Sequence, residues 1–459
     1  MADRKKRKEE PETIKFDHFE KEYRKTGNYY QDGKVVFQIT EANFGPLWEF
    51  VRNDDITDVD YNGTDLWLTD VNNKRTKVTD IEITQTFVDQ FAQRIANIKS
   101  VDFNQKNAVI EIETDTLRVS ILHNSTAVSG TSICIRKTPP FQRIVEKNAL
   151  EKMYCTREII CLIANCIKAH MNIVFCGQPR AGKTEAMKFF SNYIPDSERV
   201  ITIEDVMELR YKELKPLSDC VEIKCNEDLN YEQAIVACLK QNPRWIMIAE
   251  TRGREVNNLI QGFSTGVNGI TTLHTDHISK IPQRMINMIN DSSVEDRVLN
   301  NIYEFIDVGV LINIKKDKDG NLYRFIDQIG FFTAANENGE KNNCRMCVNN
   351  GAIIRRSFPD EISGRFRKAG IKDIFDNPDV DRRLKDQGAD VEKIKREEMI
   401  KSRDTVSTEK QAPEKKIVKE IKYPKGKPKK DLPDPNMRVK ANDFDEYESI
   451  RERRKIINE

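Results

Sequence analysis

Apolar and polar residues alternate with a period of two along much of residues 37–137. The clearest runs are 56–63, 66–69, 108–114 and 117–122. This spacing is typical of half-buried β-strands, because successive side chains point to opposite faces of a sheet. Between these runs, residues 83–98 place apolar side chains at helical spacing, at Phe87, Phe91, Ile95 and Ile98. We therefore expect a mixed α+β domain at 31–137.

A different pattern follows Thr138, Pro139 and Pro140, which predict a linker at 138–147. From there to about residue 332, short apolar runs alternate with longer helical stretches, as in α/β folds. Consecutive apolar residues predict strands that are buried on both faces. The candidate strands are 172–176, 200–205, 245–250, 269–273 and 308–313, and candidate helices are 231–241, 280–289 and 294–301. We place this second domain at 148–370.

Both ends of the chain are too polar to form a core. We expect residues 1–30 to be a mobile polar arm. Beyond residue 370, Lys, Arg, Glu and Asp dominate, most strongly at 414–430. We therefore expect 371–459 to be a charged, largely disordered tail. The alternative is a docking segment for an acidic partner or an anionic membrane surface.

Charge and cysteine content exclude several classes of protein. The 459 residues hold 75 Lys and Arg against 74 Asp and Glu, so no net field draws the chain to nucleic acid. The 10 cysteines are mostly isolated along the sequence, which fits thiols in a reducing compartment better than a disulfide framework. We find no signal peptide and no apolar run long enough to span a membrane. The expectation is a cytoplasmic protein of two or three domains.

Residues 177–184, GQPRAGKT, match the P-loop pattern. Its glycines let backbone N–H groups converge on phosphate oxygens, and the next helix adds its positive end. Lys183 can reach the β- and γ-phosphates, and the Thr184 hydroxyl can bind Mg²⁺. The motif needs an entering strand and a leaving helix, which 172–176 and 185–193 supply. We predict that ATP and Mg²⁺ bind to Gly177, Gln178, Pro179, Arg180, Ala181, Gly182, Lys183 and Thr184.

Three further polar candidates follow predicted strands. Glu250 ends an apolar strand where ligands bind in open α/β sheets, so we predict that it holds the water shell of Mg²⁺ or orients the attacking water. Glu204 ends another strand beside Asp205 and is a candidate general base, although it could equally be an ordinary strand end. His274 could donate a hydrogen bond to charge developing on the γ-phosphate, but a lone histidine is usually structural.

Four motifs in this order resemble the secretion and pilus motor ATPases of type II secretion, type IV pilus and type IV secretion systems. They are the Walker A loop 177–184, the acidic box ITIEDVMEL at 201–209, the Walker B region NPRWIMIAETRG at 242–253 and the histidine box TGVNGITTLHT at 265–275. The acidic box and the ETRG sequence are most similar to the tight-adherence pilus and conjugation-type branches. The resemblance covers roughly residues 37–332, including fragments at 58–68 and 118–122.

This resemblance implies an N-terminal mixed α+β sheet domain joined to a RecA-like P-loop ATPase domain. It also implies a homo-hexameric ring with nucleotide held between the two domains. An inner-membrane platform protein would be the partner, so the expected location is the cytoplasmic side of the cell membrane. At matching positions, Arg118 and Arg136 look like the arginines that approach the phosphates. Ala249 departs from the family, which usually has Gly before the Walker B glutamate.

The function expected from these features is a Mg²⁺-dependent ATPase motor for pilus assembly, type II or type IV secretion, or conjugative transfer. One alternative is a P-loop nucleic-acid translocase, although the balanced charge argues against direct nucleic-acid binding. Another is an ATP-binding scaffold without turnover, which would require a missing catalytic group. Type II relatives often carry a zinc loop with two CxxC pairs. Here Cys344 and Cys347 form one pair, and a structural zinc needs four ligands, so we expect no metal there unless two subunits share it.

Overall fold

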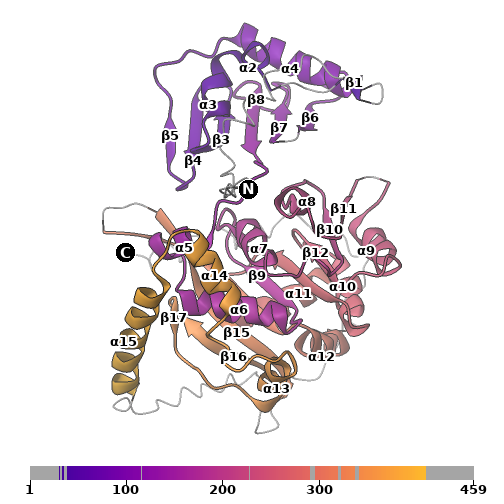
Figure 1. The fold of residues 1–459 in the computed structure, drawn as a ribbon. Coiled ribbons are helices and arrows are strands. Elements are labelled where there is room, and N and C mark those ends of the chain that lie inside the picture. Colours follow the sequence, from indigo (N-terminus) through magenta and orange to yellow (C-terminus); the bar gives the residue numbers. More distant parts are fainter. Residues whose placement is uncertain are drawn as a thin grey trace, which may run out of the picture. The chain divides into compact units, whose positions relative to one another are not determined.

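The computed structural model describes residues 30–31, 34–35, 39–114, 116–226, 228–289, 295–318, 322–335 and 341–409. The chain divides into two units, residues 1–399 and residues 400–459. The first unit holds a six-stranded and a nine-stranded sheet, together with a short hairpin of β1 (Tyr30–Gln31) and β2 (Lys34–Val35) (Figure 1). Nearly all of the predicted arm and the part of the tail beyond residue 409 lie outside the described residues.

The six-stranded sheet is antiparallel, with strand order β5-β4-β3-β8-β7-β6. Its strands are β3 (Ile56–Tyr61), β4 (Leu66–Asp70), β5 (Arg75–Lys77), β6 (Val109–Glu113), β7 (Leu117–Leu122) and β8 (Ser132–Lys137). One face packs against α4 (Gln85–Lys99), which begins where the Thr84 hydroxyl accepts a hydrogen bond from the Phe87 N–H. The period-two runs and the helix predicted from the sequence are therefore confirmed.

Apolar side chains from the inner face of this sheet and from α4 form one core. Three short elements complete it, namely α2 (Glu41–Phe44), η1 (Gly45–Leu47) and α3 (Trp48–Arg52). Val59, Phe91, Ile95 and Ile121 are each no more than 1% exposed. The outward-facing residues between the buried ones on β7 and β8 include Arg118 and Arg136, so the same alternation that builds the core presents these arginines on the opposite face.

The nine-stranded sheet has the order β11-β10-β12-β13-β9-β14-β15-β16-β17. The strands from β11 to β14 in this order run parallel, and β15 to β17 continue the sheet in antiparallel fashion. Their bounds are β9 (Ile173–Cys176), β10 (Val200–Glu204), β11 (Cys220–Lys224), β12 (Trp245–Ile248), β13 (Asn268–Leu273), β14 (Val308–Lys316), β15 (Leu322–Ala335), β16 (Lys341–Asn349) and β17 (Ala352–Ile353). All five predicted strands are present.

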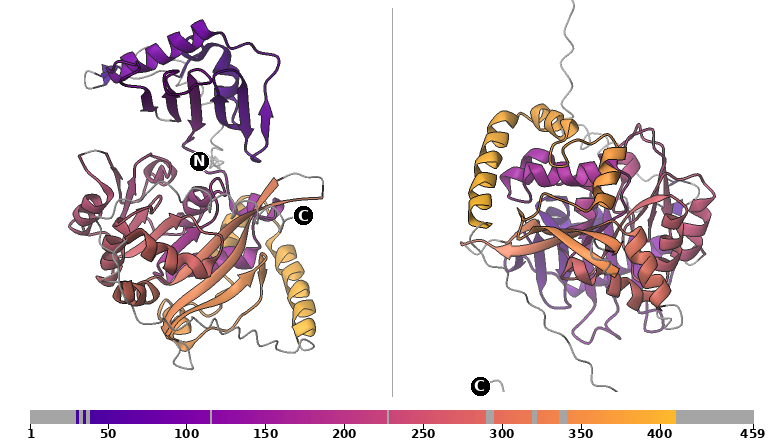
Figure 2. Two further views of the ribbon diagram at one scale, coloured as in Figure 1. Left: turned by 180° about the vertical axis from the view of Figure 1, so that it is seen from behind. Right: turned by 90° about the horizontal axis from the view of Figure 1, so that it is seen from below.

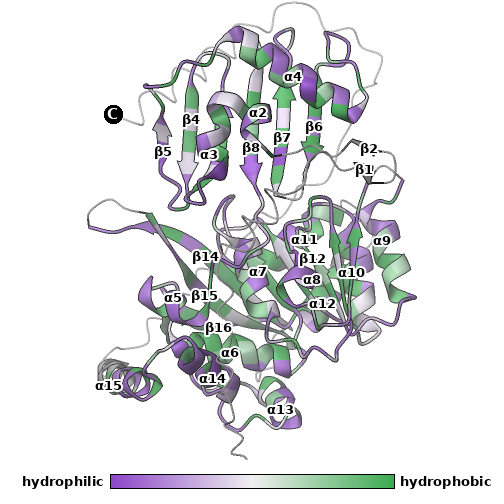
Figure 3. Ribbon diagram, turned by 45° about the horizontal axis from the view of Figure 1, so that its top comes forward, coloured by the Kyte–Doolittle hydropathy of each residue, from purple (hydrophilic) through white to green (hydrophobic). Residues whose placement is uncertain are grey.

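Helices cover both faces of this sheet, which explains why its strands are apolar on consecutive residues. Within β9, Ile173 and Phe175 join one apolar cluster while Val174 and Cys176 join the other. Figure 3 shows the central strands coloured as hydrophobic along their length. The helices are α5 (Glu146–Glu151), α6 (Arg157–Lys168), α7 (Lys183–Ser191), α8 (Tyr211–Leu214), α9 (Tyr231–Leu239), α10 (Glu255–Ser264), η2 (Ile278–Lys280), α11 (Ile281–Ile289) and α12 (Glu295–Phe305).

Residues 371–391 differ from the sequence expectation, which placed them in a disordered tail. Three helices follow β17, namely α13 (Asp360–Lys368), α14 (Pro378–Asp386) and α15 (Val391–Glu409) (Figure 2). Of these, α14 packs beside α6, and Glu398 of α15 accepts a hydrogen bond from the Glu158 N–H of α6. Phe375, Val380, Leu384 and Val391 are each at most 5% exposed within the cluster that contains α6. The composition misled because few apolar residues are needed when they are spaced to form a single helix face.

Charged groups also fix this C-terminal segment in place. Arg157, at the start of α6, is only 3% exposed and its guanidinium contacts carboxylates of Asp376 and Asp381, the latter at 2.6 Å. Asn165 donates to the backbone carbonyl of Ile374 at 3.0 Å. The acidic residues of this segment led to the prediction of disorder, yet Asp376 and Asp381 neutralise the buried Arg157. In the described residues, no helix is long and apolar enough to cross a membrane.

Candidate functional site

The loop from Gly177 to Thr184 connects β9 to the start of α7, as the motif requires. Arg180 and Gly182 both have positive φ angles, at 66° and 92°. Such left-handed residues let the N–H groups of a loop converge on an anion. At Gly177, an added Cβ atom would lie 2.4 Å from the Ile312 carbonyl oxygen of neighbouring β14, so only glycine fits this close approach.

Lys183 is mostly buried beneath this loop. Its Nζ lies 3.3 Å from the carbonyl oxygens of both Gly177 and Gln178, and 3.0 Å from Nδ1 of His274. Burial lowers the pKa of Lys183 to about 8, and the charge of Glu250 partly opposes this shift. The ammonium is thus held by neutral acceptors that an anionic phosphate would replace favourably.

A continuous row of polar contacts crosses the carboxyl ends of β9, β13 and β12. His274, just after β13, contacts Lys183 through Nδ1 and the Glu250 Oε1 through Nε2, the latter at 2.9 Å. Nδ1 also lies 3.3 Å from the Gly177 carbonyl oxygen, so the imidazole is held between the phosphate loop and Glu250. One histidine therefore joins the predicted phosphate lysine to the predicted Walker B carboxylate.

Arg252 extends the row to the acidic box. Its guanidinium donates to Glu250 Oε2 at 2.8 Å and to Asp205 Oδ2 at 3.3 Å. Burial by itself raises the pKa of Glu250, but the hydrogen bond from Arg252 and the charges of Arg252, His274 and Lys183 outweigh burial and lower it. Glu250 is consequently ionised near neutral pH. Sequence reasoning missed Arg252, although the ETRG sequence that holds it was part of the resemblance.

The two glutamates of the acidic box, residues 201–209, have different surroundings. Glu204 is 0% exposed, and its Oε2 accepts hydrogen bonds from the N–H groups of Glu208 and Leu209, both at 2.9 Å. It does not line the cavity described below, whereas Glu208 does. The structure therefore does not support Glu204 as a general base, because a water attacking a nucleotide in this cavity has no access to its carboxylate. Strand β10 ends at Glu204, four residues before Glu208, the glutamate that lines the cavity.

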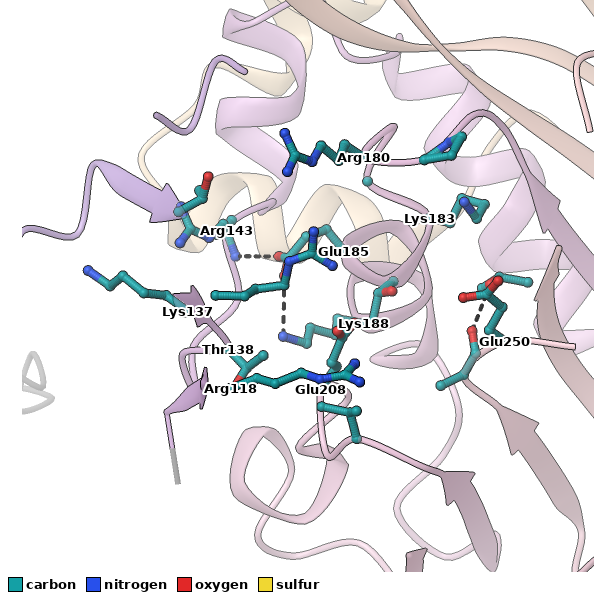
Figure 4. Close-up of a pocket in the computed structure, with 18 of the residues that line it drawn as sticks. Arg118, Lys137, Thr138, Arg143, Arg180, Lys183, Glu185, Lys188, Glu208 and Glu250 are labelled. Atoms are coloured by element: carbon teal, nitrogen blue, oxygen red, sulfur yellow. Dashed lines mark hydrogen bonds and ion pairs between the residues drawn. The ribbon is translucent and has the colours of Figure 1, made fainter. Parts of the chain in front are cut away.

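A cavity of about 590 Å³ adjoins the phosphate loop. Figure 4 shows Lys183 and Glu250 on one side of it and Arg118, Glu208 and Lys188 further along. Its lining residues are Thr57, Asp58, Asn73, Arg118, Arg136, Lys137, Thr138, Pro139, Arg143, Pro179, Arg180, Gly182, Lys183, Thr184, Glu185, Lys188, Asp205, Val206, Glu208, Ala249, Glu250, Arg252, Thr272, His274 and Arg324. Nine of these are Lys or Arg and five are Asp or Glu. This excess of positive charge favours a polyanionic ligand.

Arg118 and Arg136, the two arginines that the resemblance singled out, both line this cavity. Arg136 Nε donates to Asp58 at 3.0 Å, and Arg118 lies 3.6 Å from Glu111. Arg324 lines it too, and its Nε donates to the carbonyl oxygen of Arg180 in the phosphate loop at 3.2 Å. No motif marks Arg324 in the sequence, because β15 brings it to the loop only in the folded chain.

Oxygen donors suited to Mg²⁺ are present beside the loop. The Thr184 hydroxyl and the Glu250 carboxylate both line the cavity, and Mg²⁺ prefers such oxygen ligands. The described residues contain no cluster of three or more His, Cys, Asp or Glu that could hold a metal by themselves. Cys344 and Cys347 pack in different apolar clusters on opposite faces of the sheet, and burial raises the pKa of both thiols.

Comparison with known proteins finds relatives that match parts of this chain. An uncharacterized protein of Bacillus anthracis is 28% identical over 277 residues, which are 58% of this chain and 62% of that protein. The type IV secretion system protein PtlH of Bordetella pertussis is 34% identical over 127 residues, covering 26% of this chain and 37% of PtlH. The aligned region thus spans less than two thirds of either relative.

Among solved structures, the DotB ATPase of Yersinia pseudotuberculosis is 18% identical, with 67% of this chain and 82% of that chain covered at a TM-score of 0.48. A likeness at this level says nothing about function. The sequence profile of the family described as type II/IV secretion system protein matches residues 72–357, which include all four motifs and most of both sheets. Because that match extends over more than half of the sequence, the chain belongs to the type II/IV secretion system protein family.

Proposed function

We propose that the protein is a Mg²⁺-dependent ATPase motor that powers type IV secretion, pilus assembly or conjugative transfer. The observation that carries this proposal is the row of contacts from Lys183 through His274 to Glu250, at one edge of a cationic cavity. These groups are a lysine for the phosphates, a histidine that can hydrogen-bond to charge on the γ-phosphate, and an ionised carboxylate, which suit phosphoryl transfer from ATP to water. Family membership and the secretion-system name of a relative support the same function.

The strand order supports a RecA-like core. One strand, β13, separates β9, which leads to the phosphate loop, from β12, which leads to Glu250. His274 follows the intervening strand and therefore lies between the two. In this arrangement the carboxylate faces the loop across the width of one strand, which leaves room for the attacking water beside the terminal phosphate.

The residues around the loop divide the work of binding. Thr184, and Glu250 through water, would hold Mg²⁺, which supplies positive charge to the phosphate oxygens when bound. Lys183 would exchange its carbonyl and imidazole acceptors for phosphate oxygens, since a charge-assisted hydrogen bond is stronger than a neutral one. His274 would then lose its contact with Lys183 but keep the one with Glu250, so its environment would change when phosphate binds.

We assign the proton-accepting role to Glu208, which lines the cavity, rather than to Glu204. In hydrolysis, the water oxygen forms a bond to the γ-phosphorus while the bond from that phosphorus to the bridging oxygen of ADP breaks. The proton of the water passes to the carboxylate, and the products are ADP and phosphate. Arg118 and Arg136 would stabilise the charge that spreads over the transferring group.

Assembly is part of this proposal as well. The family implies a homo-hexameric ring at the cytoplasmic face of the inner membrane, where a platform protein of the secretion or pilus machine would be its partner. Closure of the cavity around ATP would then be converted into movement of that partner. The two arginines extend from the six-stranded sheet, whereas the phosphate loop belongs to the nine-stranded sheet, which fits a cycle that depends on domain closure.

The test compares Lys183→Ala with Glu250→Gln. ATP affinity and the steady-state rate of hydrolysis are measured together, with Lys168→Ala as control because Lys168 is exposed and does not line the cavity. We expect Lys183→Ala to lose tight ATP binding, because it removes a phosphate contact. Glu250→Gln should keep affinity but lose turnover. Equal loss of affinity in both variants, or a wild-type protein that hydrolyses no ATP, would contradict the proposal.

A further inference from the structure

Glu204 is a buried carboxylate for which the proposed mechanism has no direct use. It ends β10, between the parallel neighbours β11 and β12, and its side chain is completely buried. Among the described residues, the charges that act on it most are those of two other carboxylates, Glu208 and Glu222, and not those of a cation. A charged group buried without a cation destabilises a fold unless its hydrogen bonds compensate, so the contacts of this carboxylate indicate what it does.

Both hydrogen bonds to the Glu204 side chain come from the turn at residues 205–210. Oε2 accepts from the N–H groups of both Glu208 and Leu209 at 2.9 Å. The segment 205–210 between β10 and α8 is irregular. The Glu208 N–H is shared between Glu204 and the Val206 carbonyl oxygen, which lies 2.8 Å away, whereas the Leu209 N–H depends on Glu204 as its acceptor. Leu209 is 1% exposed and packs into the apolar cluster, which fixes the same turn from the other side.

Fixing the backbone at 208 determines where the Glu208 side chain can reach. Glu208 lines the nucleotide cavity, and its charge acts on Lys183 and Arg136, which both line it too. Without an acceptor below the turn, the Leu209 N–H would have to find water or a new backbone partner, and the Glu208 N–H would keep only the Val206 carbonyl oxygen. The turn would loosen, and the Glu208 carboxylate would lose its fixed position. A general base loses efficiency sharply when it is displaced by about 1 Å.

The other oxygen of Glu204, Oε1, is buried and has no hydrogen-bond partner among the described residues. Burial raises the pKa of this carboxyl to about 7, against the two backbone hydrogen bonds, which lower it. Burial therefore disfavours the charged form of this side chain, and only one of its two oxygens, Oε2, has hydrogen-bond partners. This pattern differs from that of an ordinary strand end, where the carboxylate would turn to solvent.

We propose that Glu204 is a positioning residue for hydrolysis: from beneath the acidic box it binds the backbone of residues 208 and 209 and so aims Glu208 into the cavity. This inference rests on the proposed function, because it assigns the base to Glu208. It also makes a structural claim about the turn that holds whether or not ATP is hydrolysed.

The experiment compares Glu204→Gln with Glu204→Ala. The amide oxygen of glutamine can accept the same two hydrogen bonds, whereas alanine has no acceptor. We expect Glu204→Ala to lower kcat at least tenfold while ATP affinity changes less than threefold, and Glu204→Gln to retain kcat within threefold of wild type. Thr202→Val is the matched control, because Thr202 lies two residues earlier on the same face of β10 and its buried hydroxyl has no partner among the described residues.

A double variant and a second measurement keep the outcomes distinct. Adding Glu204→Ala to Glu208→Gln should lower kcat no further, because both changes disable the same base. Amide hydrogen exchange at Leu209, whose N–H depends on Glu204, should become at least tenfold faster in Glu204→Ala and stay near wild type in Glu204→Gln. Unchanged exchange in Glu204→Ala overturns the inference even in a protein without ATPase activity. A loss of kcat that glutamine does not rescue, or equal losses of kcat and affinity, overturns it in an active one.

Discussion

Removing residues from 371 onward should unfold the nine-stranded domain, whereas removing only 410–459 should leave it intact. A composition dominated by charge predicts that both truncations are harmless. The structure separates them, because α14 and the first turns of α15 cover the cluster that contains α6 and β9. The perturbation therefore tests whether this C-terminal segment belongs to the core of the nine-stranded domain.

The magnitude follows from the apolar side chains that the shorter protein would lack. Five of them are at most 8% exposed, namely Ile371, Phe375, Val380, Leu384 and Val391. Complete burial of such a side chain contributes about 1.5 to 3 kcal/mol. Together they contribute on the order of 10 kcal/mol, which is similar to the entire stability of a typical domain, about 5 to 15 kcal/mol. Loss of the segment also removes the Asp376 and Asp381 partners of buried Arg157.

The assay is urea unfolding of both truncated proteins, followed by circular dichroism, together with ATP hydrolysis. A point variant provides a milder version of the same test, because Leu384→Ala should lower the free energy of unfolding by about 2 to 5 kcal/mol. Lys385→Ala is its control, since Lys385 is exposed on the same helix. A protein truncated after residue 370 that unfolds at the same urea concentration as the full chain would refute the reasoning.

Two further predictions concern charge. Arg118→Ala and Arg136→Ala should each lower ATP turnover at least tenfold with a much smaller change in affinity, because arginines that stabilise the transferring phosphoryl group contribute roughly 10³ to 10⁵ in rate. Wild-type turnover in both variants would show that they are ordinary surface cations. The second uses Glu204, whose pKa burial raises from 4.5 to about 7 while Glu208 and Glu222 add to the rise. The protonated Glu204 carboxyl therefore contributes stability below pH 4.5, and this contribution is lost as pH rises through 7. The free energy of unfolding of Glu204→Gln, which does not ionise, should accordingly rise relative to that of wild type by up to about 3 kcal/mol between pH 4.5 and pH 8. Urea unfolding at both pH values measures this, and a difference that does not change with pH would be inconsistent with it.

Local sequence patterns were sufficient to predict the order of elements and the phosphate loop. Strands buried on both faces need consecutive apolar residues, and half-buried strands need alternation, so each sheet left its own local pattern. The loop was equally local, because the glycines, Lys183 and Thr184 act within eight residues. Glu250 was predicted for a similar reason, since ligands bind where buried parallel strands end, and its role stays a prediction.

The folded chain was needed to tell which glutamate of the acidic box faces the cavity. Glu204 and Glu208 lie four residues apart in an irregular segment, where no period fixes the direction of a side chain. The turn is set by hydrogen bonds to Glu204 and by burial of Leu209, neither of which a local pattern reveals. Arg252 and Arg324 escaped notice because their partners lie on other strands.

The C-terminal segment shows the same limit in its packing. Val380 and Leu384 are spaced four residues apart and form one helix face, but the surrounding charges lowered the mean hydropathy of the segment. Average composition measures how much apolar surface a segment has, whereas folding depends on whether that surface is gathered on one side and meets a partner. The partner here is α6, which lies more than 200 residues earlier in the chain, as the hydrogen bond from Arg157 to Asp381 shows. Long-range interactions of this kind are absent from any local pattern, and they decided the extent of the domain.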